Sequence, residues 1–197
     1  MRDLNTDICR CSVVSVVRSK DTDLSIRVQQ IFKAESETKA WWQRVPDSFK
    51  LDTSTILTTN QSTLPRILLT NLIYHQSLCA LHSSIVPLFC WSKGDRAYSS
   101  ARQLSAQIAF EHACTISILI RTLLNSGFHV SSMPIFVAYA AYSGCAVQIP
   151  FFWCSQPEVK AQAQLNVQAN MNMMQEMSSY WNLASLLVRL PPVSPVL

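Results

Sequence analysis

The chain has 197 residues, of which 49% are hydrophobic and only 14% charged, with a formal net charge of +4. This length and apolar content are enough for one domain with a substantial core. Basic residues outnumber acidic ones by only ten to eight in residues 1–66 and by six to four in the remainder, so they form no electrostatic footprint for nucleic acid.

The cysteines indicate a reducing compartment. There are seven, an odd number, and none forms a C-x-x-C pair or the even framework of a small secreted domain. Charged residues are scattered through the first twenty positions, which does not fit a secretory signal peptide. Residues 122–157 carry no charged side chain, but their apolar run, 135–149, is shorter than the roughly 20 residues that a membrane-spanning helix needs. We therefore expect no membrane insertion.

The first half of the chain predicts two long helices. Residues 1–23 have no clear periodicity and are expected to be a poorly ordered lead-in. A helix is predicted over 24–44, followed by a Thr- and Ser-rich connection over 47–65 with a short extended piece at 55–59. The next helix, 65–86, has an apolar stripe at helical spacing made by Ile67, Tyr74, Leu78, Leu81, Ile85 and Leu88.

The second half predicts three more helical segments. Ser100 and Gln103 have the spacing of a capping box for a helix that ends near Gly127, and a helix over 135–149 presents small residues. Ser155-Gln156-Pro157-Glu158 predicts the start of a long helix that Ser178-Ser179 can divide, followed by a tail at 191–197. Together these patterns predict an all-α fold, an irregular array of about six to eight helices in one domain spanning 24–190. The expected stripe of the last helix consists of Leu165, Ala169, Met173, Met177, Trp181, Ala184 and Leu187 or Val188.

Several blocks, in order, resemble the fungal-specific transcription factor domain, the middle homology region of zinc-binuclear-cluster regulators. Trp42-x-x-Val45-Pro46 resembles the family's W-x-x-L-P element, with valine in place of the usual leucine. Tyr74-His75 and Leu81-His82 resemble its central helix, with Ser83 where a basic residue is common. The segments 101–124, 134–146 and 165–181 resemble its later helices.

The resemblance implies a non-enzymatic, nuclear regulatory domain that takes part in RNA polymerase II transcription. Its expected partners are other segments of a full-length regulator or the transcription machinery, and a homodimer is left open. The family's DNA-reading module is a six-cysteine cluster that holds two zinc ions. Cys9-Arg10-Cys11 does not have its C-x-x-C spacing, so zinc and DNA binding are expected only of a module missing from this sequence. No catalytic, metal or DNA-binding residue is expected in this chain.

One alternative is a small helical enzyme or ligand-binding protein that uses the face of His75, Cys79 and His82. These residues are at positions i, i+4 and i+7, so the two histidines are separated by about 10.5 Å of helix rise and cannot share one metal ion. Hydrogen-bonded core histidines are the simpler expectation. Thiol chemistry at Cys114 is disfavoured because His112, two residues away, points in a different direction.

Other candidate residues suggest contacts with a ligand or partner. Met171, Met173, Met174 and Met177 are suited to an adaptable groove but more often fill a core. Of the adjacent Trp41 and Trp42, one can anchor another segment of a longer protein. The predicted ligand or partner contacts are Trp42, Tyr74, His75, His82, Met173 and Trp181.

Overall fold

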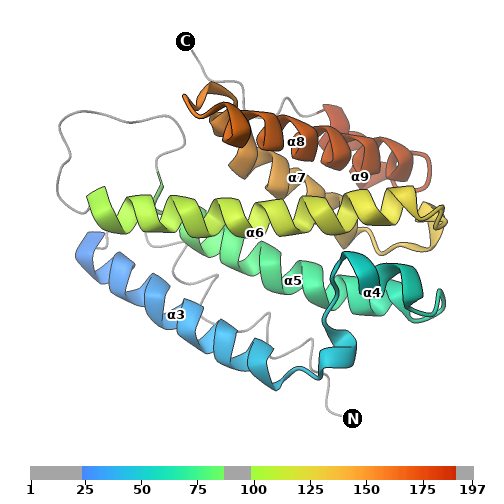
Figure 1. The fold of residues 1–197 in the computed structure, drawn as a ribbon, viewed down its shortest axis with the longest axis horizontal. Coiled ribbons are helices and arrows are strands. Elements are labelled where there is room, and N and C mark those ends of the chain that lie inside the picture. Colours follow the sequence, from blue (N-terminus) through green and yellow to red (C-terminus); the bar gives the residue numbers. More distant parts are fainter. Residues whose placement is uncertain (1–23, 87–98, 190–197) are drawn as a thin grey trace.

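The computed structural model describes residues 24–86 and 99–189. In this part the chain forms seven α-helices, three short 3-10 helices and no strand, which confirms the predicted all-α class (Figure 1). The elements are α3 (Leu24–Arg44), η1 (Asp47–Phe49), α4 (Thr53–Thr58), α5 (Leu64–Ser83), α6 (Ser99–Asn125), η2 (Val130–Ser132), α7 (Phe136–Gln148), η3 (Ile149–Trp153), α8 (Pro157–Ser178) and α9 (Asn182–Arg189).

The long helix α6 runs through the middle of the array. The helices α3, α4 and α5 lie on one side of it in Figure 1, and α7, α8 and α9 lie on the other. Helix α5 contacts α3, α6 and α7, whereas α8 packs against α6, α7 and α9. The helix α3 is therefore at an edge of the array, where α5 is its main neighbour.

Two apolar clusters form the core. The larger one is formed by residues from each of the helices α4 through α9. It includes Leu72, Ile116, Leu123, Val137 and Met173, all with no exposed surface. The smaller cluster lies between α3 and α5 and contains Ile31, Ala34, Tyr74, Leu78, Leu81 and Ile85. The buried α5 residues confirm the predicted stripe up to Ile85, whereas Leu88 lies outside the described residues.

Several local signals in the sequence are confirmed. The bounds of α3 match the prediction, and α6 ends at Asn125, just before Gly127 adopts a positive φ of 71°. That left-handed conformation favours glycine because a side chain is strained there. Pro157 occupies the first turn of α8, and the chain is divided between Ser178 and Asn182. The predicted lead-in and tail lie outside the described residues.

The predicted extended piece at 55–59 is wrong, because Thr53–Thr58 is the helix α4. The Asp52 carboxylate accepts hydrogen bonds from the backbone N–H groups of Ser54 and Thr55, both at 2.8 Å. The Thr55 hydroxyl in turn accepts from the Asp52 N–H at 2.7 Å. This reciprocal capping box starts a helix in a segment whose Thr and Ser content indicated a connection. The Ser54 hydroxyl also donates to this carboxylate at 2.6 Å, and together with the bonds from Thr55 it lowers the pKa of Asp52 to about 2.

Two predicted helix starts are also corrected. Ser100 lies inside α6, which already begins at Ser99, and so it cannot be its N-cap. At α8 the N-cap is Gln156 rather than Ser155, and it makes no side-chain capping bond. The predicted place of Pro157 in the first turn of α8 is confirmed.

The predicted stripe of the last helix is confirmed at Ala169, Met173 and Met177 of α8 and at Ala184 and Leu187 of α9, which are all buried. Two of its members are exposed, Trp181 and Leu165. Leu165 is 58% exposed, whereas the adjacent Asn166 is 1% exposed. The asparagine is buried because its amide donates to Gln148 Oε1 at 2.7 Å. At this turn of α8 the buried residue is therefore Asn166, which contacts α7, and not Leu165, which the apolar pattern predicts to be buried.

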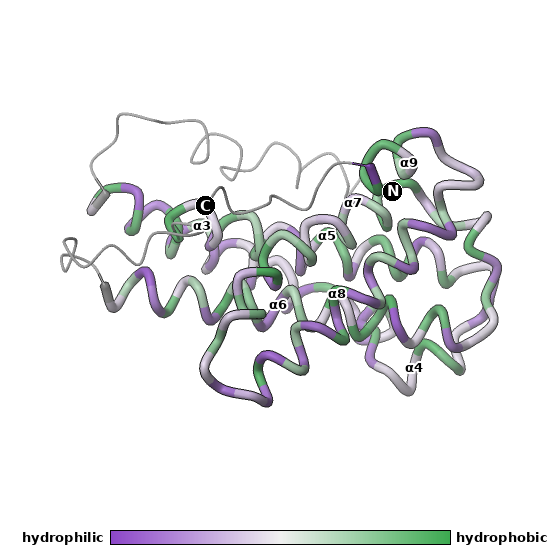
Figure 2. Tube along the Cα trace, turned by 90° about the horizontal axis from the view of Figure 1, so that it is seen from above, coloured by the Kyte–Doolittle hydropathy of each residue, from purple (hydrophilic) through white to green (hydrophobic). Residues whose placement is uncertain are grey.

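None of the helices in the described part is both long and apolar enough to cross a lipid bilayer. Figure 2 shows polar and apolar residues interspersed along the helices.

Candidate functional site

An aromatic stack joins the end of α3 to the middle of α5. The Trp42 and Tyr74 rings are nearly parallel, 7° apart, with centroids separated by 4.3 Å. Both rings also approach His75 edge-on, and Lys50 lies 6.0 Å from the Trp42 ring. Trp41 and Trp42 are both half-buried, and both pack against the smaller apolar cluster. The W-x-x-V-P element and the Tyr-His element of the sequence are thus in direct contact.

Asn71 fixes the segment that follows α3 onto α5. Its Nδ2 donates to the carbonyls of Phe49, at 2.7 Å, and Ile67, at 2.8 Å, while its Oδ1 accepts from the Leu51 N–H at 2.9 Å. Asn71 is 1% exposed, so its side-chain amide has no access to water and depends on these hydrogen bonds. Helical periodicity does not predict this role of Asn71, because its partners Phe49 and Leu51 are in a different segment of the chain.

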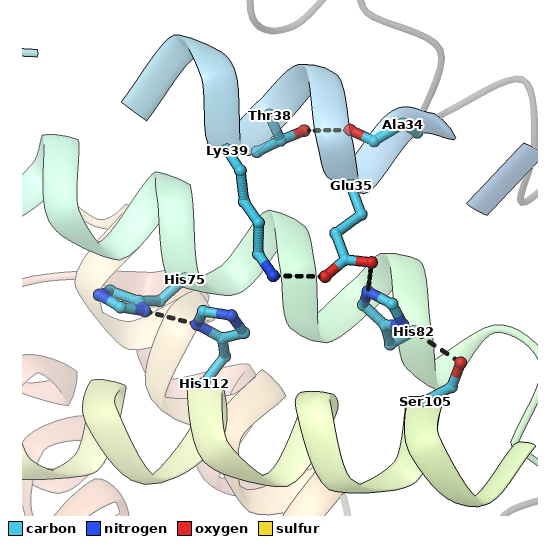
Figure 3. Close-up of polar contacts among 8 residues, drawn as sticks. All are labelled: Ala34, Glu35, Thr38, Lys39, His75, His82, Ser105 and His112. Atoms are coloured by element: carbon cyan, nitrogen blue, oxygen red, sulfur yellow. Dashed lines mark hydrogen bonds and ion pairs between the residues drawn. The ribbon is translucent and has the colours of Figure 1, made fainter. Parts of the chain in front are cut away.

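His75 on α5 pairs with His112 on α6. Their Nδ1 atoms are 2.8 Å apart, so one ring must carry its proton on Nδ1 and the other must leave Nδ1 free to accept (Figure 3). Burial lowers the pKa of His75 to about 3, helped by the charge of a protonated His112. Burial also lowers the pKa of His112 to about 4, and Lys39 lowers it further. Both rings are therefore neutral at pH 7.

A second cluster of polar side chains links α3, α5 and α6 around His82, which has no exposed surface (Figure 3). Its Nδ1 is 3.2 Å from Ser105 Oγ, and its Nε2 is 3.5 Å from Glu35 Oε2. The other Glu35 oxygen accepts from Lys39 at 2.6 Å. Burial lowers the pKa of His82, and Lys39 lowers it further although Glu35 opposes the shift, so this ring is neutral at pH 7.

The alternative His75, Cys79 and His82 face does not converge on one point. The Cys79 thiol donates to the Ala109 carbonyl at 3.3 Å, and burial raises its pKa far above the usual value. The two histidines have the separate partners given above. No group of three or more His, Cys, Asp or Glu side chains that could hold a metal ion occurs in residues 24–86 and 99–189.

The six predicted contact residues lie in three different places. Trp42, Tyr74, His75 and His82 lie together at the interface of α3, α5 and α6. Met173, in contrast, is fully buried in the larger core, together with Met174 and Met177. Trp181 is 38% exposed and lies just before α9.

Four further interface residues were not predicted as contacts: Glu35, Lys39, Ser105 and His112. The spacing of Glu35 and Lys39 is a readable i, i+4 ion pair. No spacing signal pairs His112 with His75 or Ser105 with His82, because these contacts join separate helices. Cys114, which the sequence places near His112, instead lies 3.7 Å from Gln148 Oε1, and burial raises its pKa to about 11.

A separate buried polar network holds α6, α7 and α8 together. Ser117 Oγ accepts from the Gln148 and Asn170 side chains, both at 2.9 Å. Gly144 allows α7 to approach α8 here, since an added Cβ would lie 2.8 Å from Asn170 Nδ2. This network fixes the packing on the far side of α6 from the α3 interface.

No protein-family model, curated protein sequence or solved structure matches the chain. The family resemblance thus stays a prediction based on the residues that carry it.

Proposed function

We propose that this chain is the regulatory domain of a fungal nuclear transcription regulator of the zinc-binuclear-cluster class, acting in RNA polymerase II transcription and without enzymatic activity. The observation that carries the proposal is the stack of Trp42 on Tyr74. Each ring belongs to one of the two sequence blocks on which the resemblance depends, and the two blocks are in separate helices. The stack gives the Trp42 block and the Tyr74 block one shared structural role, which is to hold α3 against α5.

The proposed mechanism is a shift in how α3 docks on α5 and α6. The interface combines a small apolar cluster with an aromatic stack, a histidine pair and the contact of the Glu35 carboxylate with His82. The strength of these contacts depends on the position of α3 relative to α5 and α6. A partner or effector that binds one position of α3 more tightly than another therefore stabilises that position. Coupling between two sites is typically worth about 1–3 kcal/mol. The expected partners are other segments of the regulator, the transcription machinery or a second copy of the chain.

DNA recognition and zinc binding are assigned to a module outside this sequence. Sequencing the transcript and the flanking genomic DNA tests this assignment, because the proposal expects an in-frame six-cysteine zinc cluster. A transcript that encodes no such module would argue against a DNA-reading regulator.

The alternative enzyme or ligand-binding function at His75, Cys79 and His82 has no single observation in its favour, since the three side chains have different partners. Alanine at both histidines would be its direct test: loss of an activity with an intact fold would support it.

A further inference from the structure

A cavity with a volume of about 480 Å³ lies where the end of α5, the first half of α6 and η3 meet. This volume is within the range of roughly 300–1,000 Å³ that small-molecule sites occupy. Its wall uses none of the side chains proposed above for regulation, although Ala106 and Ala109 lie between Ser105 and His112 along α6. Its wall includes Ser83, Ala106, Ala109, Val147, Phe151 and Trp153.

The shape of the cavity follows from small residues on α6 facing aromatic residues on η3. Ala106 and Ala109 leave space because neither side chain extends beyond Cβ. The Phe151 ring is held in place by Phe110, with ring centroids 4.2 Å apart. Trp153 is 66% exposed although it is the largest side chain of the wall. A flat apolar molecule between these rings and the alanines would remove water from Ala106 and from both rings, since only Ala109 is already buried.

The described residues of the wall offer few polar groups and no charged one. Among the described residues that line the cavity there is no Asp, Glu, Lys, Arg or His. The Ser83 hydroxyl donates to the Ala80 carbonyl at 3.2 Å, which leaves its oxygen free to accept a hydrogen bond. The Cys154 thiol and the Ser155 hydroxyl are the other side-chain polar groups there. A charged ligand would lose its hydration without gaining a counter-charge, whereas a neutral one would not.

We propose that this cavity binds a small uncharged molecule with a flat apolar ring system and one or two hydrogen-bonding groups. The inference goes beyond the regulatory function and does not depend on it. Binding can be measured on the purified 197-residue chain, so failure of either proposal leaves the other standing.

Isothermal titration of the 197-residue chain with 2-naphthol tests the proposal. One saturable site per chain is expected. Ala106→Phe places a ring in the cavity and should weaken binding by about tenfold or more. Ala161→Phe is the matched control, because Ala161 is exposed on α8 and does not line the cavity, and its affinity should stay within about twofold of wild type.

Trp153→Ala keeps the test decisive if Ala106→Phe does not fold. Trp153 is mostly exposed, so its removal should leave the fold intact and weaken binding by about threefold to tenfold. Absence of saturable binding to wild type, or equal affinity of wild type and Trp153→Ala, would overturn the proposal. Binding that occurs only after residues 87–98 are replaced by a glycine-serine linker would also overturn it, because the chain itself would then be the occupant.

Discussion

The Trp42 ring lies 4.3 Å from the Tyr74 ring and nearly parallel to it, which joins the end of α3 to α5. Replacing Trp42 with alanine removes this stack and part of the smaller apolar cluster, and we expect a loss of about 2–3 kcal/mol in the free energy of unfolding. A double-mutant cycle with Tyr74→Ala should give a coupling energy of about 0.5–1.5 kcal/mol. Urea unfolding measures both quantities.

Trp153→Ala is the control for that experiment, because this tryptophan is 66% exposed. Its effect on stability should be within about 0.5 kcal/mol. Additive effects of Trp42→Ala and Tyr74→Ala would mean that the stack does not couple the two helices.

Asn71→Ala should destabilise the fold by about 2–4 kcal/mol, because it leaves the Leu51 N–H and the Phe49 carbonyl without their buried partner. Asn71→Asp keeps an acceptor for the N–H but cannot donate to the carbonyl when ionised, so it should also be destabilising. The exposed Asn172 on α8 provides the matched control, with an expected change within about 0.5 kcal/mol on substitution by alanine. A similar small change at Asn71 would contradict its role in holding residues 49–51.

Stability should fall as the pH drops from 7.5 to 5. The pKa of His75 is about 3 and that of His112 about 4 in the folded chain, whereas a histidine in an unfolded chain has a pKa of about 6.5. Below pH 6.5 the unfolded chain therefore takes up protons that the folded chain does not. The stability due to the two neutral rings is present above that pH and is lost as the pH falls toward the folded values. Each histidine should contribute a loss of roughly 2 kcal/mol between pH 7.5 and 5.

The double variant His75→Gln, His112→Gln separates this effect from the titration of acidic residues. Its urea-unfolding free energy should depend less on pH over the same interval, even if it is less stable at pH 7.5. Equal pH dependence of wild type and variant would show that the pair does not govern acid sensitivity.

Gly144→Ala should destabilise the chain by about 1–3 kcal/mol, although alanine is the better helix former by about 1 kcal/mol. The added Cβ would lie 2.8 Å from Asn170 Nδ2, which Ser117 holds in place. Asn170→Ala should relieve this clash, so the cost of Gly144→Ala should be smaller in that background. Thermal unfolding of the four proteins gives the comparison, and an equal cost in both backgrounds would contradict the close contact.

Features encoded locally were predictable from the sequence. The helix α3, the stripe of α5 and the glycine after α6 depend on propensity, periodicity and a required backbone conformation at Gly127. Four of the six predicted contact residues share one interface: Tyr74, His75 and His82 are all on α5, and Trp42 of α3 packs on Tyr74.

Contacts between helices were not predictable from one sequence. The pairing of His75 with His112 depends on where α6 crosses α5. The burial of Asn166 instead of Leu165 depends on Gln148 of α7, which supplies the acceptor. Helical periodicity fixes which residues share a face, but the neighbouring helices decide which face is buried.

The most direct test of the regulatory account tethers residues 24–190 to a heterologous DNA-binding domain and measures reporter transcription in a fungal cell. The account predicts that the tethered segment changes reporter output, and that Trp42→Ala alters that change at equal protein abundance because it loosens α3. Trp153→Ala should leave the output as in wild type. Reporter output equal to that of the DNA-binding domain alone, for a segment shown to be folded and nuclear, would contradict the account.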